Sequence, residues 1–163
     1  MLSIYFHSYF IRQHYYVIGA SKDGLVFVGS QDKGFEELKR IYPSGKIIDD
    51  NGRTQFYAQQ IEEYLAGCRK DFDIPIDVNG TTFQKSVWKE LLKIPYGQTR
   101  TYTQIAEAIN RPTAIRAVAT AIGKNPLLIV IPCHRVVAKS RKLGGYRGGL
   151  TMKRELLQLE SDK

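Results

Sequence analysis

The first half of the chain has the hydrophobic pattern of paired strands. Residues 15–20 and 25–29 are short runs rich in β-branched and aromatic side chains. The turn-forming sequence 21–24 separates them, so together they predict a β-hairpin. A hairpin requires antiparallel pairing, and we therefore expect an antiparallel sheet in this part of the chain.

Helical spacing follows the hairpin at two places. Residues 35–42 predict a short helix that Pro43 ends, and apolar side chains repeat every three or four positions over 57–65. The Pro-containing stretch 71–79 predicts an extended linker. We therefore expect a small N-terminal α/β domain over residues 1–76.

Beyond the linker the pattern is mainly helical. Thr82 is placed to cap a helix, and Pro-Tyr-Gly at 95–97 ends the helical stretch. The apolar face expected for this helix comprises Phe83, Val87, Trp88, Leu91 and Leu92. Residues 77–163 are expected to form a second, mainly helical domain, which makes the chain an α+β protein.

Two short helices separated by a tight break are predicted next. Thr101 and Gln104, three residues apart, resemble a capping box, and the helix they begin is broken at 110–112. A second helix is predicted over 113–123, with Thr113 as its cap. This arrangement fits a helix-turn-helix, although an ordinary pair of packed helices has the same pattern.

The second of these helices favours the DNA-binding alternative. Ile115, Val118 and Ile122 are expected to face inward. The side chains then expected to point outward are Arg116, Ala117, Thr120 and Ala121. Small side chains let a helix approach a nucleic-acid groove closely, and an arginine among them can enter the base stack or a narrow minor groove.

The charge distribution agrees with a nucleic-acid partner for the second half. Residues 1–79 hold 9 basic and 11 acidic side chains, whereas residues 80–163 hold 15 and 5. Such a basic half is typical of a phosphate-binding surface, although a merely soluble basic surface gives the same count. Polar residues interrupt the N-terminal 20 residues, so we expect neither a signal peptide nor a membrane span, and a cytoplasmic or nuclear location.

The most reactive candidate side chain is Cys133, which follows an apolar, strand-like run that begins at Leu127. It is flanked by Pro132, His134 and Arg135, and cationic neighbours are expected to lower the pKa of a thiol and so activate it as a nucleophile. A disulfide with Cys68, the other of the two cysteines, is disfavoured by a reducing location. The three scattered histidines give no metal cluster, and no cofactor is expected.

Together with Asn125-Pro126 before it and the glycine-rich run 144–149 after it, the sequence Pro-Cys-His-Arg-Val resembles the O6-alkylguanine-DNA alkyltransferase family. The likeness covers roughly residues 80–160. It implies a ribonuclease H-like N-terminal domain and a C-terminal domain with a helix-turn-helix. It also implies direct repair of O6-alkylguanine, with O4-alkylthymine left open, in double-stranded DNA entered from the minor groove by a monomer.

The same resemblance assigns roles in the chemistry. Cys133 would attack the alkyl carbon and keep it as a thioether, so that each molecule acts once. His134 would take the thiol proton through a water molecule, and Glu160 would hold His134 in the required tautomer. Asn125 would fix the turn that precedes Cys133.

Further residues would bind DNA and the extruded base. Tyr102 would donate to guanine N3, and Arg116 would fill the space that the base leaves. The remaining binding residues that the resemblance implies are Ala117, Thr120, Arg135, Val136, Tyr146 and Arg147. Many family members carry a small residue where this chain has Arg147, so the accepted size of the alkyl group stays open.

Two other functions compete with alkyl transfer. One is non-catalytic binding of alkylated bases, which the presence of Cys133 disfavours. The other is a thiol hydrolase built from Cys133, His134 and Glu160, for which the sequence offers no acyl pocket. Whether several copies bind DNA cooperatively is left open.

Overall fold

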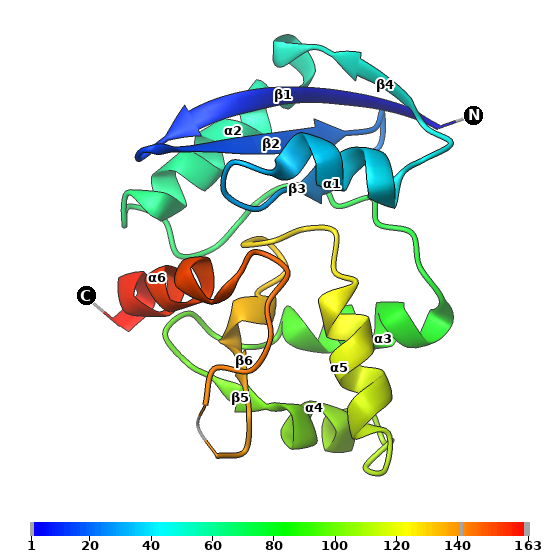
Figure 1. Cartoon of the computed structure of the whole chain (residues 1–163), viewed down its shortest axis with the longest axis vertical. Coiled ribbons are helices and arrows are strands. Elements are labelled where there is room, and N and C mark those ends of the chain that lie inside the picture. The colour runs from blue at the N-terminus through cyan, green and yellow to red at the C-terminus, as the bar shows by residue number, and fades with distance from the viewer. Residues whose placement is uncertain (1, 141, 162–163) are drawn as a thin grey trace. The chain divides into compact units, whose positions relative to one another are not determined.

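The computed structural model describes residues 2–140 and 142–161, which form two compact units. One comprises the described part of Met1–Val78 with Pro126–Val130, and the other comprises Asn79–Asn125 with the described part of Ile131–Lys163. Figure 1 shows a sheet in the first unit and mainly helices in the second. The domains 1–76 and 77–163 stay a prediction, because compactness does not show that either part folds alone.

The first unit contains a four-stranded sheet in the order β3-β2-β1-β4. The strands are β1 (Ser3–Ile11), β2 (His14–Ala20), β3 (Leu25–Val28) and β4 (Lys46–Asp49). Strands β1, β2 and β3 pair antiparallel, whereas β4 runs parallel to β1. The predicted hairpin and the predicted α+β class with a mostly antiparallel sheet are therefore confirmed.

Strand β1 was not predicted, and its turn explains why. Arg12 and Gln13 link β1 to β2 with φ angles of 47° and 75°. Positive φ at both central positions matches the strand twist in a two-residue hairpin, but such turns are recognised in a sequence by Asn or Gly. Here neither residue type occurs at these positions, so the turn has no local signal.

Two helices complete the first unit. Helix α1 (Gly34–Ile41) lies within one residue of its predicted range, whereas helix α2 (Asn51–Leu65) contains the predicted range 57–65 but begins six residues before it. A buried cluster joins α1 to the sheet and comprises Ile4, Val17, Val26, Phe27 and Leu38. Burial of this apolar surface stabilises the unit.

The described part of the second unit contains four α-helices and a small parallel pair of strands. The helices are α3 (Thr82–Leu91), α4 (Tyr102–Ala108), α5 (Ile115–Gly123) and α6 (Leu150–Ser161), and the strands are β5 (Arg100–Thr101) and β6 (Val136–Val137). In the described part of the chain no helix is long and apolar enough to cross a membrane.

The cap and the apolar face of α3 differ slightly from the prediction. Thr81, not Thr82, is the N-cap: its side chain accepts from the Gln84 N–H, and the Gln84 side chain accepts from the Thr81 N–H, both at 3.0 Å. Val87, Trp88 and Leu91 are buried as expected. Leu92, the C-cap residue, is 48% exposed, because its side chain projects well to one side of the face formed by Val87 and Leu91.

The predicted pair of short helices is present as α4 and α5, which pack together. The capping box of Thr101 and Gln104 is confirmed, with hydrogen bonds of 2.8 and 3.1 Å. The prediction that Thr113 caps α5 is wrong. Ala114 is the N-cap, and its methyl side chain cannot accept a hydrogen bond from the first turn; its own N–H bonds to Arg111 O at 2.9 Å, which continues the preceding turn into the helix.

The orientation of α5 also differs at two positions. Val118 and Ile122 are buried as predicted, but Ile115 is 38% exposed and Ala121 is only 3% exposed. Helix α3 packs over the turn that contains Ala121, whose carbonyl accepts from Trp88 Nε1 at 2.9 Å. Ile115, the first residue of the helix, lies at the edge of this packed face.

The apolar run that begins at Leu127 forms buried turns, and the prediction of a strand-like segment is wrong. Leu127 makes an isolated bridge to Val28. The chain then turns, with the Val130 N–H bonded to Leu128 O at 2.8 Å and a φ of 74° at Ile129. A fully buried turn and a fully buried strand have the same apolar pattern, so periodicity alone does not distinguish them.

Candidate active site

A short 3-10 helix, Cys133–Arg135, carries the candidate nucleophile. It lies between the buried turns and strand β6, which pairs with β5. The Cys133 N–H bonds to Ile131 O at 2.7 Å, and only 3% of Cys133 is exposed. The thiol is therefore held in a tight turn inside the second unit.

Asn125 contacts the nucleophile directly. Its Nδ2 donates to Ile131 O at 3.0 Å and to Cys133 Sγ at 3.1 Å. The residue is 1% exposed, so little water competes for these bonds. The Asn125 side chain therefore links Ile131 to Cys133 across the turn that these two residues form, and it donates a hydrogen bond to the sulfur.

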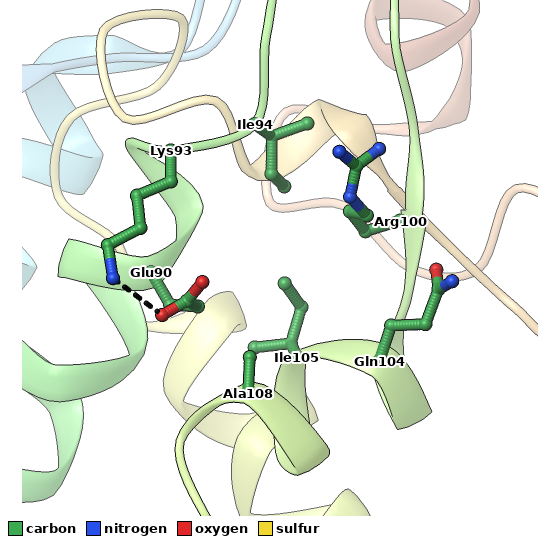
Figure 2. A pocket seen from close by; sticks show the side chains of 7 residues that line it. All are labelled: Glu90, Lys93, Ile94, Arg100, Gln104, Ile105 and Ala108. Carbon is green, nitrogen blue, oxygen red and sulfur yellow. Dashed lines mark hydrogen bonds and ion pairs between the residues drawn. The ribbon is translucent and has the colours of Figure 1, made fainter.

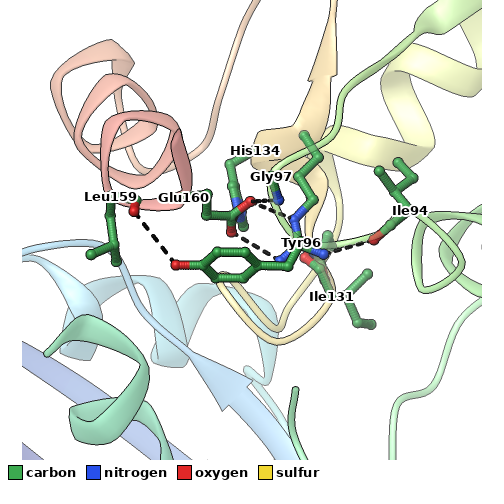
Figure 3. A network of polar contacts seen from close by, with 9 residues as sticks. Ile94, Tyr96, Gly97, Ile131, His134, Leu159 and Glu160 are labelled. Carbon is green, nitrogen blue, oxygen red and sulfur yellow. Dashed lines mark hydrogen bonds and ion pairs between the residues drawn. The ribbon is translucent and has the colours of Figure 1, made fainter. Parts of the chain in front are cut away.

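His134 and Glu160 form a buried pair, seen in Figure 3 (Nε2 to Oε2, 2.7 Å). An ionised carboxylate can only accept, so Nε2 carries the proton and Nδ1 is the basic nitrogen of the ring. Burial lowers the pKa of His134 below its ordinary value, although the contact with Glu160 opposes this shift. The ring is therefore neutral at neutral pH and able to accept a proton.

The Glu160 carboxylate also binds Arg135. Arg135 Nε donates to Oε1 at 2.8 Å and Nη2 donates to Oε2 at 2.9 Å, while Nη1 donates to Ile94 O at 2.7 Å. The Gly97 N–H completes the set at 3.2 Å (Figure 3). Arg135 is only 6% exposed, so its guanidinium is committed to this network, and its expected contact with DNA stays a prediction.

The expectation that sequence neighbours lower the pKa of Cys133 is wrong. Complete burial raises the pKa of the thiol above its ordinary value, because a thiolate is poorly solvated in the interior. The opposing influences are the Asn125 hydrogen bond and the charges of Arg147 and Lys153. The thiol is therefore neutral at neutral pH, and a base must remove its proton before the sulfur can act as a nucleophile.

Lys153 belongs to the site but was not predicted. Its Nζ donates to Val136 O at 2.7 Å, to Gly145 O at 3.2 Å and to Leu143 O, and the residue is fully buried. Burial lowers its pKa to about 8. The available signal was its position seven residues before Glu160, which places both on one face of a helix.

The glycine-rich loop lies beside this site. Burial raises the pKa of Tyr102, which therefore remains protonated, and the Gly145 N–H bonds to its hydroxyl. Gly144 has a φ of +71°, and an added Cβ would lie 2.6 Å from Tyr102 Oη. Tyr146 is half-buried, and the Arg147 side chain reaches Asn125 O. The structure thus brings Tyr102 and Arg147 to the region of Cys133.

The expected DNA-contacting side chains of α5 lie on its exposed face. Arg116, Ala117 and Thr120 are all exposed, and Thr120 Oγ1 donates to Arg116 O at 3.0 Å. This face has small side chains and one arginine, as the sequence predicted.

A cavity of about 220 Å³ lies elsewhere in the second unit, and Figure 2 shows its walls. Residues of α3, β5 and α4 line it, including Arg100 and Gln104. Opposite charges meet on one wall, where Lys93 Nζ lies 3.2 Å from Glu90 Oε1. None of the lining residues is one of the predicted site residues, so we do not assign this cavity to the substrate.

Comparison with known proteins first gives the class. Residues 82–162 match the family model described as 6-O-methylguanine DNA methyltransferase, DNA binding domain. The match contains both α4–α5 and the buried thiol with its histidine–carboxylate pair. The match therefore gives the class of protein: the second unit is similar to the DNA-binding domain of proteins that transfer methyl groups from DNA.

Similarity over the whole chain gives the family. The inducible methylated-DNA–protein-cysteine methyltransferase of Bacillus subtilis is 46% identical over 162 residues, covering 97% of this chain and 90% of that protein. The crystal structure of Mycobacterium tuberculosis O6-methylguanine methyltransferase has a TM-score of 0.84 at 36% identity, covering 97% and 93% of the two chains. A structure of that organism's OGT in complex with DNA has a TM-score of 0.81 at 37% identity, covering 98% and 92%. The chain belongs to the methylated-DNA–protein-cysteine methyltransferase family.

Proposed function

We propose that this protein repairs alkylated DNA by moving the alkyl group from guanine O6 to Cys133. The thiol proton passes to the basic nitrogen of His134 through a water molecule, and Sγ forms a bond to the alkyl carbon. The carbon–oxygen bond breaks, its electron pair stays on guanine, and the proton held by His134 passes to the guanine, which leaves neutral. The observation that carries this assignment is the buried thiol of Cys133, hydrogen-bonded by Asn125 at 3.1 Å.

The electrostatics of the site suit this sequence of events. Before the reaction both the thiol and the imidazole are neutral, so neither buried group has to carry a charge in the resting protein. A proton can then move from the thiol to the imidazole when the substrate is bound. Glu160 stabilises the imidazolium that forms. A thioether has no easy leaving group, so each molecule acts once.

The proposed substrate is O6-alkylguanine in double-stranded DNA, bound by a monomer from the minor groove, in whichever compartment holds the DNA. The exposed face of α5 would enter the groove, Arg116 would replace the extruded base, and Tyr102 would donate to guanine N3. Replacing Arg116 with Ala should slow repair of duplex DNA far more than reaction with free O6-benzylguanine. Equal losses on the two substrates would exclude a role of Arg116 in base extrusion.

Intact-protein mass spectrometry after incubation with an O6-methylguanine duplex tests the transfer. Wild type should gain one methylene, located on Cys133 by peptide mapping. Cys133→Ser should gain nothing yet still bind DNA, because phosphate contacts supply most of the affinity. Cys68→Ser is the matched control, since Cys68 is exposed, and should behave like wild type. Tight binding with unchanged mass in the wild type would instead indicate a non-catalytic binding protein.

A further inference from the structure

The Arg147 side chain makes a contact that its position in a glycine-rich loop did not suggest. Its Nε and Nη2 both donate to Asn125 O, at 3.3 and 3.1 Å. The amide of the same Asn125 donates to Cys133 Sγ at 3.1 Å. Two successive contacts therefore connect the loop to the nucleophile.

The loop has a separate attachment before Arg147. Lys153 Nζ holds the carbonyls of Leu143 and Gly145, and the Gly145 N–H bonds to the hydroxyl of Tyr102. Tyr146 lies between this attachment and the Arg147 contact, so the loop is fixed on both sides of the tyrosine expected to line the base pocket. The attachment that follows Tyr146 is made by the side chain of Arg147.

The Arg147 guanidinium also lies close enough to the sulfur for its charge to act there. It lowers the pKa of Cys133, against the larger effect of burial. Hydrogen bonds from a charged donor are stronger than those between neutral groups, particularly where water is scarce. An apolar group that displaces the guanidinium would therefore have to break the hydrogen bonds between Arg147 and Asn125 O. It would offer the Asn125 carbonyl no hydrogen bond in exchange.

We infer that Arg147 is a specificity-determining residue that narrows the space beside Cys133 and slows the transfer of large alkyl groups relative to methyl. Its contact with Asn125 O holds the loop against the turn that carries the nucleophile. A methyl group adds one carbon at the sulfur, whereas a benzyl group is far larger and would have to displace this contact. This inference rests on the proposed transfer to Cys133.

Single-turnover rates on matched duplexes containing O6-methylguanine or O6-benzylguanine test the inference. Because both substrates are duplexes, a change in DNA affinity cancels in the benzyl-to-methyl rate ratio. In Arg147→Ser this ratio should rise about tenfold, the equivalent of one charged hydrogen bond. Arg147→Lys keeps the charge but cannot offer two donors in a fixed fork, so its ratio should rise less.

A control variant and a pH series separate positioning from general damage. Arg154→Ser removes an equal charge from an exposed position of α6 and should leave the ratio unchanged. The apparent pKa of the methyl-transfer rate should rise in Arg147→Ser and return toward the wild-type value in Arg147→Lys. Thermal melts of each variant establish that it is folded at the assay temperature.

The outcomes distinguish this inference from the proposed function. If Arg147→Ser has the wild-type ratio, or loses rate equally on both substrates, the residue does not select for size and the inference is overturned. If wild type transfers neither group to Cys133, the proposed function fails instead. A raised ratio in Arg154→Ser would also count against Arg147, since any lost charge would then suffice.

Discussion

Replacing Glu160 with Gln is the sharpest available perturbation of the site. The carboxylate is 1% exposed and accepts from His134 Nε2, from Arg135 Nε and Nη2, and from the Gly97 N–H. Glutamine has nearly the same shape but carries no charge and presents an NH2 donor. The Arg135 guanidinium would then remain buried without a counter-charge.

The expected cost follows from that buried charge. Removing one partner of a buried ion pair typically destabilises a protein by about 3–5 kcal/mol. For a chain of this size a loss of 1 kcal/mol lowers Tm by about 2–4 °C, so Glu160→Gln should melt roughly 6–20 °C lower. Alkyl transfer should also slow by about 10²–10⁴-fold, because His134 loses the group that fixes its tautomer.

Thermal denaturation at pH 7 and single-turnover transfer at a temperature well below both melting points measure the two effects. Glu107→Gln, the same change on the exposed surface of α4, is the control and should shift stability by no more than about 0.5 kcal/mol. In the double variant with Arg135→Met the uncompensated charge is absent. The double variant should therefore be clearly more stable than the sum of the two single losses predicts.

Two results would refute this reasoning. A decrease in Tm of less than 2 °C in Glu160→Gln would mean that water or another group already compensates Arg135. Additive losses in the double variant would mean that the two side chains do not stabilise each other. Unchanged transfer in a folded Glu160→Gln would separately exclude Glu160 from the chemistry.

Three further predictions concern the same site. Lys153 has a pKa of about 8 in the folded protein against an ordinary 10.5, so above pH 8 the unfolded chain binds more protons than the folded one. The free energy of unfolding of the wild type should therefore increase relative to that of Lys153→Met from about pH 8 to 10, which urea titrations would measure. Asn125→Ala should raise the pKa of Cys133 further, which a pH–rate profile shifted to higher pH would reveal. Methylated Cys133 should lower Tm by several degrees, because an added carbon overpacks a buried site; identical melting curves would disprove this.

The sequence predicts the helices of the second unit well because their signals are local. The Thr101–Gln104 capping box forms as expected, and Val118 and Ile122 face inward. The caps at Thr82 and Thr113 were misplaced by one residue each, which is the usual uncertainty at a helix end. Packing between helices, which buries Ala121 under Trp88, is not encoded in either helix alone.

The errors in the first unit and in the buried turns share a different cause. Strand β4 pairs with β1 across about 40 residues, and its four residues carry no alternating pattern of their own. The run from Leu127 is apolar because it is surrounded by protein, whatever its backbone conformation. Tertiary burial rather than local propensity decides such segments.

The candidate site was predictable as far as its motif extends. Cys133, His134 and Glu160 were identified from the motif, and the structure joins the last two at 2.7 Å. The contact between Arg147 and Asn125 spans 22 residues, and that between Lys153 and Val136 spans 17, so neither has a local signature.

The environment of Cys133 is therefore set by Asn125, which precedes it by 8 positions, and by residues that follow it by 14 to 27 positions, from Arg147 to Glu160, rather than by its immediate neighbours. His134 and Arg135 both bind the Glu160 carboxylate, so the positive charge of Arg135 is paired with this carboxylate rather than with the thiol. Lys153 and Arg147 supply positive charge from α6 and the loop instead. Helix α6 carries both Lys153 and Glu160. Its docking therefore places both the partner of the proton acceptor His134 and the positive charge that stabilises the Cys133 thiolate. The proposed alkyl transfer therefore depends on the docking of α6 in the second unit.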